Sequence, residues 1–220
     1  MATIMAFAAS EALAEKLNAI TQAQQVEPSV VHREILREIH DLFIDEVLTA
    51  YFNGPIDAVG AEGSVVNMIL RGVGVISKAG RSLAMRLLEK LEPEDQTKLV
   101  EHFQKLQYEL DGKMHIAFAF TPTEAERAKA VFAQVAEEEE VELDGLIEVL
   151  HSVAEGATGN FLDGTVAALK LGRFSRGLVK ATQATIRKST ATAIDKGVPA
   201  LGRKYRKDLA AYYKEMLFDV

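Results

Sequence analysis

Apolar residues recur every three or four positions along most of the chain, which is the spacing of one face of a helix. The clearest case spans residues 69–87, where the apolar positions are separated by steps of 4, 3, 4, 3 and 4: Ile69, Val73, Ile76, Gly80, Leu83 and Leu87. Such a narrow stripe is typical of a seam along which a helix packs against a partner. Four cationic residues lie on the opposite side, within about 140° of arc: Arg71, Lys78, Arg81 and Arg86.

A second segment, near residues 165–194, repeats this arrangement. Its basic residues fall within about 120° of arc: Lys170, Arg173, Arg176, Lys180, Arg187 and Lys188. Apolar residues gather on the other side: Leu171, Phe174, Leu178, Val179 and Ile186. Glycine-rich turns at 54–63 and 156–164 precede the two helices and suggest hinges. We therefore predict two cationic amphipathic helices that bind an anionic or acidic surface.

Prolines and glycines divide the chain into helical segments. Thr121-Pro122-Thr123-Glu124, for example, has the pattern of a helix start with a capping box. The predicted helices are 3–25, 28–53, 63–91, 93–110, 122–155, 162–195 and 199–217. This pattern predicts an all-α fold, a compact bundle of about seven helices that forms a single domain over 1–220.

Two features leave the architecture partly open. Residues 114–120 alternate between the two faces of a strand, but no second strand is evident, so we expect a helix or an extended connector. Residues 41–48 weakly resemble 144–150, and each precedes a glycine-rich turn and a cationic helix. A duplicated unit of three helices, with sub-units 1–112 and 113–220, would explain this. The match involves a handful of common residues, so chance explains it better.

Charge is distributed unevenly along the chain. The net charge is −7, yet residues 164–220 hold 12 basic and 4 acidic side chains, whereas residues 89–163 hold 6 basic and 18 acidic ones. Two interpretations follow: the acidic middle pairs with the basic end inside one bundle, or the basic end has an anionic partner.

The sequence indicates a cytoplasmic protein, with peripheral membrane attachment as the alternative. No segment approaches the roughly 18 apolar residues that a membrane-spanning helix needs. The alanine-rich start has no basic residue before Ile4, so we interpret it as the beginning of a helix and not as a signal peptide. The chain has no cysteine, which excludes disulfides and thiolate metal sites.

Candidate catalytic or metal-binding residues are few. Glu148 and His151 form one Glu-x-x-His unit, but di-iron bundles need two such units and the chain has no second. Acidic residues and His151 share one predicted helix face, which we interpret as the surface that pairs with basic residues: Glu140, Asp144, Glu148, His151 and Glu155. No catalytic triad or phosphate-binding loop is present. We predict a protein that is not an enzyme and uses neither cofactor nor metal.

The function predicted from these features is interaction through the two cationic helices with an anionic membrane surface or an acidic protein partner, as in bacterial membrane-active effectors. Two alternatives remain. One is a helical-bundle carrier or enzyme with an apolar pocket between helices. The other is a structural homo-oligomeric module of a phage or secretion system. Nucleic acid is disfavoured, because aromatic residues are not interleaved with the basic ones and the chain is acidic.

Overall fold

The chain runs twice through the same series of elements in the computed structural model, which describes residues 2–60, 62–137 and 143–220, without the side chains of Arg173 and Phe174. The first half comprises β1 (Thr3–Ala8), α1 (Glu11–Val26), α2 (Arg33–Leu48), the π-helical segment η1 (Thr49–Asn53), α3 (Gly54–Val59), α4 (Ser64–Glu89), α5 (Pro93–Lys105) and β2 (Gln107–Leu110). The second half comprises β3 (Lys113–Ala119), α6 (Pro122–Glu137), α7 (Leu143–Ala157), η2 (Thr158–Asp163), α8 (Gly164–Ala167), α9 (Arg173–Thr192), η3 (Ala193–Gly197), α10 (Val198–Ala200), α11 (Arg203–Glu215) and β4 (Leu217–Asp219).

The four described strands form one antiparallel sheet in the order β2-β3-β1-β4. Its centre lies where Ala6 of β1 pairs with Ala117 of β3. Equivalent hydrogen bonds flank this point: Ala6 N donates to Met216 O, and Ala117 N to Leu106 O, both at 2.9 Å. The last strand of each half pairs with the first strand of the other half, so the sheet ties the halves together around an approximate two-fold axis.

Side-chain contacts repeat as well: a contact in one place recurs elsewhere between residues whose numbers differ by about 110 from those of the first. The equivalent pairs are the ion pairs Lys16–Glu38 and Arg127–Glu148, and the hydrogen bonds of Tyr212 Oη to Ala50 O (3.1 Å) and of His102 Nε2 to Asn160 O (3.0 Å). The two contacts of each pair involve equivalent elements. The repeat therefore includes individual interactions as well as the order of the elements.

Two glycines allow the side chains of Tyr212 and His102 to lie close to the backbone of the other half. A Cβ atom at Gly54 would overlap the Tyr212 hydroxyl, and a Cβ atom at Gly164 would overlap the ring of His102. Gly54 begins α3 and Gly164 begins α8, where each half continues its long middle helix beyond the π-helical segment. Glycine is required at both places because the side chain from the other half fills the space that a Cβ would occupy.

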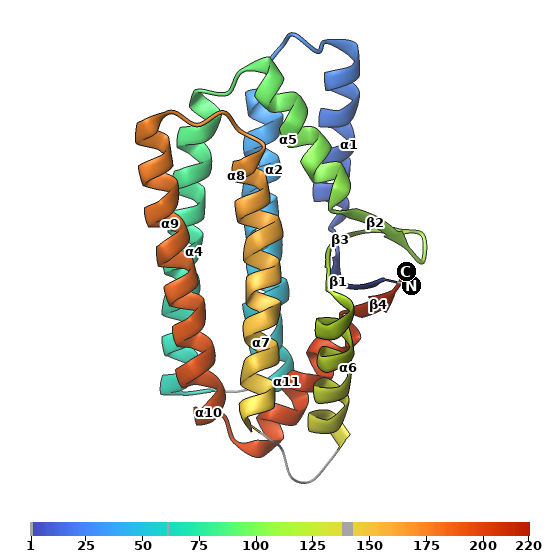
Figure 1. Cartoon of the computed structure of the whole chain (residues 1–220), viewed down its shortest axis with the longest axis vertical. Coiled ribbons are helices and arrows are strands. Elements are labelled where there is room, and N and C mark those ends of the chain that lie inside the picture. Colours follow the sequence, from blue (N-terminus) through green and yellow to red (C-terminus); the bar gives the residue numbers. More distant parts are fainter. Residues whose placement is uncertain (1, 61, 138–142) are drawn as a thin grey trace.

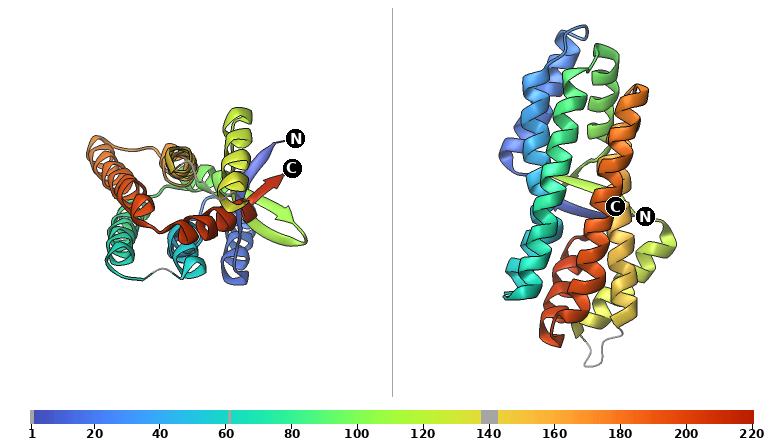
Figure 2. Two further views of the ribbon diagram at one scale, coloured as in Figure 1. Left: turned by 90° about the horizontal axis from the view of Figure 1, so that it is seen from below. Right: turned by 90° about the vertical axis from the view of Figure 1, so that its left-hand side faces the viewer.

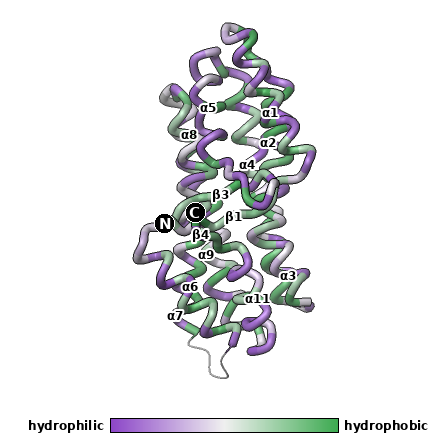
Figure 3. Tube along the Cα trace, turned by 90° about the vertical axis from the view of Figure 1, so that its right-hand side faces the viewer, coloured by the Kyte–Doolittle hydropathy of each residue, from purple (hydrophilic) through white to green (hydrophobic). Residues whose placement is uncertain are grey.

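The long helices α2, α7, α4 and α9 form layers on one side of the sheet, and the shorter helices α1, α5, α6 and α11 lie above and below it (Figure 1). Helices α4 and α9 lie side by side at one edge of the molecule, and α4 also packs along α2 (Figures 1 and 2). The continuous helices α2-η1-α3 and α7-η2-α8 form the middle. The mainly hydrophobic strands β1 and β3 cross the molecule between the α1–α5 end and the α6–α11 end (Figure 3). Helix α11 packs on α6 and on α3 of the other half, and α5 on α1 and α8.

The largest hydrophobic core lies between the sheet and the middle helices. Its fully buried side chains include Leu13, Leu36, Leu99, Phe118 and Phe132, which come from both halves. Phe118 contacts Phe161 edge-on at 5.8 Å between ring centroids. The core is thus shared between the halves, because side chains from both fill it.

The predicted all-α bundle is confirmed in its helical architecture, to which the structure adds a small four-stranded sheet, but several predicted segments were wrong. Residues 3–25 comprise strand β1 and helix α1, and residues 114–120 form most of strand β3. The predicted helix 122–155 is two helices, α6 and α7, which pack against each other. The predicted helix 199–217 divides into α10 and α11, with strand β4 following. No described helix is long and apolar enough to cross a membrane.

The weak resemblance between residues 41–48 and 144–150 lies on the equivalent helices α2 and α7, but its residue alignment was wrong. The structural equivalence pairs Tyr51 with Phe161 and Gly54 with Gly164, which shifts the alignment by two turns of helix. The repeated unit also contains a strand at each end and is therefore larger than three helices. The boundary between residues 112 and 113 falls in the turn between β2 and β3.

Candidate functional site

The apolar seam of α4 faces the interior. Val73, Ile76 and Leu83 are buried, and Ile69, Gly80 and Leu87 are half-buried. Val73 and Ile76 form a small core with Leu48 of α2, with Ile186 of α9 packed against it. The partner of the seam is thus the rest of this chain.

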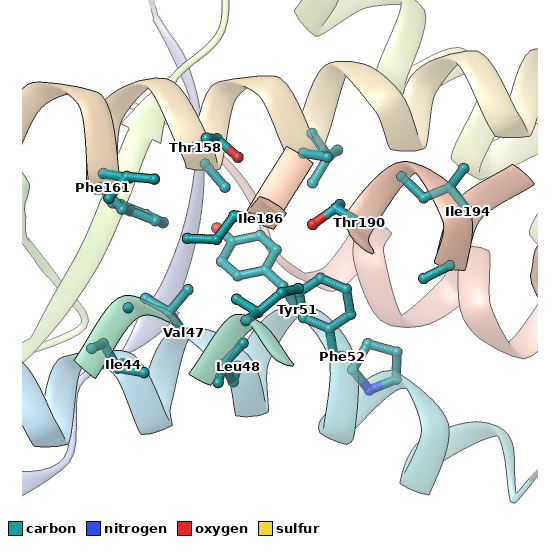
Figure 4. Close-up of a pocket in the computed structure, with 18 of the residues that line it drawn as sticks. Ile44, Val47, Leu48, Tyr51, Phe52, Thr158, Phe161, Ile186, Thr190 and Ile194 are labelled. Atoms are coloured by element: carbon teal, nitrogen blue, oxygen red, sulfur yellow. The ribbon is translucent and has the colours of Figure 1, made fainter. Parts of the chain in front are cut away.

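Most of the seam also lines a cavity of about 230 Å³. The cavity lies between the middle helices and the α4–α9 pair, and the close-up shows side chains from η1, η2 and α9 around it (Figure 4). All three π-helical segments contribute to its wall, through Tyr51 and Phe52 of η1, Phe161 of η2 and Ile194 of η3. Segments of π-helix occur frequently at functional sites, because the wider turn displaces side chains from the regular helical positions.

The wall of the cavity is apolar and contains no Asp, Glu, Lys or Arg among the described residues. Its polar side chains are His40, Tyr51, Thr158, Thr165, Thr190 and Tyr213. Burial lowers the pKa of His40, so its imidazole is neutral at pH 7. The cavity therefore offers hydroxyl groups and a neutral imidazole to a ligand, but no charge.

Tyr51 is the most unusual of these polar residues. It is 6% exposed, and its hydroxyl has no hydrogen-bond partner among the described residues. Burial raises its pKa well above the ordinary value, so the phenol stays protonated and can donate. The ring points into the cavity (Figure 4). A buried unpartnered hydroxyl costs free energy, commonly about 1–3 kcal/mol, and calls for an explanation.

Ion pairs beside the cavity link the continuous segment α7-η2 to the continuous segment α9-η3. Arg187 of α9 contacts Asp163 at 2.5 Å and Glu155 at 3.8 Å. His151 Nε2 lies 2.7 Å from an Asp195 carboxylate oxygen. Apart from these bridges, α7 and α9 make few direct contacts along their described lengths, since the cavity separates them.

The ten cationic residues predicted to bind a partner fall into three groups. Three form ion pairs within the protein: Arg81 with Asp41 and Asp45, Lys170 with Glu94, and Arg187 as above. The side chain of Arg173 lies outside the described part. The remaining six are exposed and have no ion pair with a described residue: Arg71, Lys78 and Arg86 on α4, and Arg176, Lys180 and Lys188 on α9. We call these six the exposed cations.

The face that carries the exposed cations contains apolar groups and lacks acidic residues. Neither residues 64–88 nor residues 173–192 include an Asp or Glu. Leu70, Val75 and Met85 of α4 are 42%, 47% and 40% exposed, unusual values for large apolar side chains in this protein. A shallow depression between the helices is lined by residues of both, with one exposed cation on each side: Met68, Arg71, Gly72, Val75, Lys188, Ser189, Thr192 and Ala193.

The acidic helix face that we expected to pair with basic residues does so in part. Glu148 pairs with Arg127, and Glu155 with Arg187 of the basic C-terminal quarter. Glu140 lies outside the described residues. No group of three or more potential metal ligands occurs in the described part of the chain.

Sequence reasoning missed the polar residues of the cavity. The signal that could have revealed Tyr51 is the match of Tyr51-Phe-Asn-Gly54 with Phe161-Leu-Asp-Gly164, at equivalent positions of the two halves. Comparisons with protein-family models, with curated proteins and with solved structures give no match.

Proposed function

We propose that the protein docks on anionic membrane surfaces through the outer face of α4 and α9. The observation that carries the proposal is the set of exposed cations, which lies on two adjacent helices free of acidic residues. Helices with basic and apolar groups on one face bind at the boundary between lipid headgroups and acyl chains.

The charge on this face is sufficient for reversible attachment. Each Lys or Arg near an anionic lipid surface contributes about 1 kcal/mol at physiological ionic strength. Six such residues therefore contribute up to about 6 kcal/mol, before the loss of translational freedom is subtracted. The net charge of −7 does not prevent this, because the attraction is local and decays within a Debye length of about 8 Å.

The exposed apolar side chains favour a membrane over an acidic protein face. Leu70, Val75 and Met85 project from the same helix as three of the exposed cations. Contact with a lipid surface would remove these side chains from water, adding about 25 cal/mol for each Å² of apolar area. An acidic protein surface would satisfy the cations, but it would need its own apolar patch to cover the three side chains.

Flotation with phospholipid vesicles tests the proposal. We expect the protein to float with vesicles that contain phosphatidylserine at about 50 mM salt, and to be released at about 300 mM as the charges are screened. Vesicles of phosphatidylcholine alone should bind little. Binding that does not depend on lipid charge would contradict the proposal. Failure to float with either vesicle would also overturn it and would leave an acidic protein face as the next candidate.

A further inference from the structure

We infer that the cavity beneath α4 and α9 binds a neutral, mainly apolar molecule with one oxygen-containing group that accepts a hydrogen bond from Tyr51. The ligand class is that of long-chain alcohols, esters and ketones, and excludes free carboxylic acids in their ionised form. This inference is independent of membrane docking, because it rests on the inner walls of the two helices and not on their outer face.

The repeat shows that packing does not require the Tyr51 hydroxyl. Phe161 occupies the equivalent position in the second half, and its ring centroid lies 6.1 Å from that of Tyr51. Both rings pack in the same aromatic cluster with Phe7 and Phe118. The second half fills this place with a ring that has no hydroxyl. The oxygen of Tyr51 is therefore an addition that burial penalises and that a ligand oxygen would satisfy.

Two threonine hydroxyls reinforce the polarity of the cavity. Thr158 and Thr190 line it, and neither side chain hydrogen-bonds a described residue. By contrast, Thr185 and Thr192 of the same part of the chain donate to the carbonyl one turn earlier, at 2.9 and 2.8 Å. The hydroxyls of Thr158 and Thr190 thus remain open to a ligand, one on each side of the cavity (Figure 4).

The described wall of the cavity contains no cationic residue, which disfavours a negatively charged ligand. A carboxylate would enter the cavity without a counter-ion, and burying an unpaired charge is far more costly than burying a hydroxyl that is hydrogen-bonded. Arg187 follows the cavity residue Ile186 on α9, but its guanidinium is already held by Asp163 and Glu155. The neutral end group therefore follows from the composition of the cavity.

Two probes with the same chain and different end groups test this inference: n-decanol and decanoate. Titration of the full-length protein, followed by the NMR methyl signals of Ile76 and Ile186, gives the affinity and the place of binding. We expect n-decanol to saturate these shifts and decanoate at pH 8 to bind at least tenfold more weakly. Equal affinity for the two, or no saturable shift of these methyl groups, would overturn the inference.

Substitutions distinguish the contribution of the Tyr51 hydroxyl to ligand binding from that of the cavity volume. Tyr51→Phe removes one hydrogen bond, worth about 0.5–1.5 kcal/mol, and should weaken n-decanol binding by about 3- to 10-fold. Tyr108→Phe, in the sheet, is the matched control and should leave binding unchanged. Ile186→Phe should fill the cavity and abolish binding. An unchanged affinity in Tyr51→Phe would show that the hydroxyl does not contact the ligand and would overturn the assignment, whether or not Ile186→Phe folds.

Discussion

The rings of Tyr51 and Phe161 lie on either side of the approximate two-fold axis, at equivalent positions of the two halves, with their centroids 6.1 Å apart and their planes inclined by 54°. They differ by one oxygen atom, and that atom is buried without a hydrogen-bond partner among the described residues. A repeated fold would tolerate phenylalanine at both places. The cavity is therefore asymmetric in its polar groups, although the fold around it has approximate two-fold symmetry.

Two Tyr→Phe substitutions should change stability in opposite directions. Tyr51→Phe removes an unpartnered hydroxyl, so the ligand-free protein should gain about 1 kcal/mol in its free energy of unfolding. Tyr213→Phe removes a hydroxyl that donates to Tyr51 O at 2.7 Å, so it should lose about 1–3 kcal/mol. Urea unfolding measures both. A loss of stability in Tyr51→Phe would mean that its hydroxyl has a partner in the ligand-free protein.

The helices were predictable from sequence because their apolar spacing and proline positions are local signals. The strands were missed for two reasons. Strands β2 and β3 form a hairpin across the two-residue turn Asp111-Gly112, but residues 107–110 were assigned to the predicted helix 93–110. Strands β1 and β4 are stable only through partners that are distant in sequence. Strand β3 (Lys113–Ala119) was ambiguous on its own. Besides β2, its partner is β1, whose residues 6–8 have the same Ala-Phe-Ala sequence and lie in an alanine-rich stretch that also fits a helix.

The candidate site was predictable only in part for a similar reason. Spacing identified most of the cations that share a helix face, although Lys170 lies in the connection before α9 and not on the helix. It could not identify which cations pair inside the fold. Lys170 and Arg187 pair with acidic residues on other elements, whereas Lys180 and Lys188 do not pair with a described residue. The cavity was beyond reach, because its wall combines residues from both halves that only the folded structure brings together.

Alanine substitutions at two glycines should also have opposite effects. Gly164→Ala would push a methyl group into the His102 ring and should destabilise the protein by about 1–3 kcal/mol. Gly177 lies on the exposed side of α9 with no atom near the position of a Cβ. Gly177→Ala should therefore stabilise by about 1 kcal/mol, through helix propensity alone. Unfolding curves in urea report both changes. A stabilised Gly164→Ala would show that the His102 ring does not lie against Gly164.

The carboxylate of Glu94 should titrate at unusually low pH. Hydrogen bonds from Lys170 and then from Lys98 lower its pKa from 4.5 to about 2. Because the pKa is lower in the folded state, the stabilisation from this carboxylate is fully present above pH 4.5 and is lost as the pH falls towards 2. NMR titration of the Glu94 side chain checks the value. In Lys170→Met the pKa should move back towards 4.5, and an unchanged value would show that the pair does not form in solution.

Adjacent cations of α9 should have separable roles. Arg187→Gln breaks ion pairs with Asp163 and Glu155 and should lower the unfolding free energy by about 1 kcal/mol while vesicle binding persists. Lys188→Gln should leave stability within about 0.5 kcal/mol and weaken vesicle binding by about 5-fold, the equivalent of one lost cation. Thermal unfolding measures the stability of both variants, and vesicle flotation measures their binding. The reverse pattern would show that the pairing assignments are wrong.

Charge reversal on the outer face of α4 and α9 tests the central claim most directly. One variant carries Arg71→Glu, Lys78→Glu, Lys180→Glu and Lys188→Glu. The control carries the same change in net charge at exposed cations elsewhere: Lys105→Glu, Lys113→Glu, Arg203→Glu and Lys204→Glu. Flotation with phosphatidylserine vesicles should be abolished in the first variant and retained in the second, with unchanged circular dichroism in both. Retained flotation of the first variant, or equal loss in the two, would contradict docking through α4 and α9.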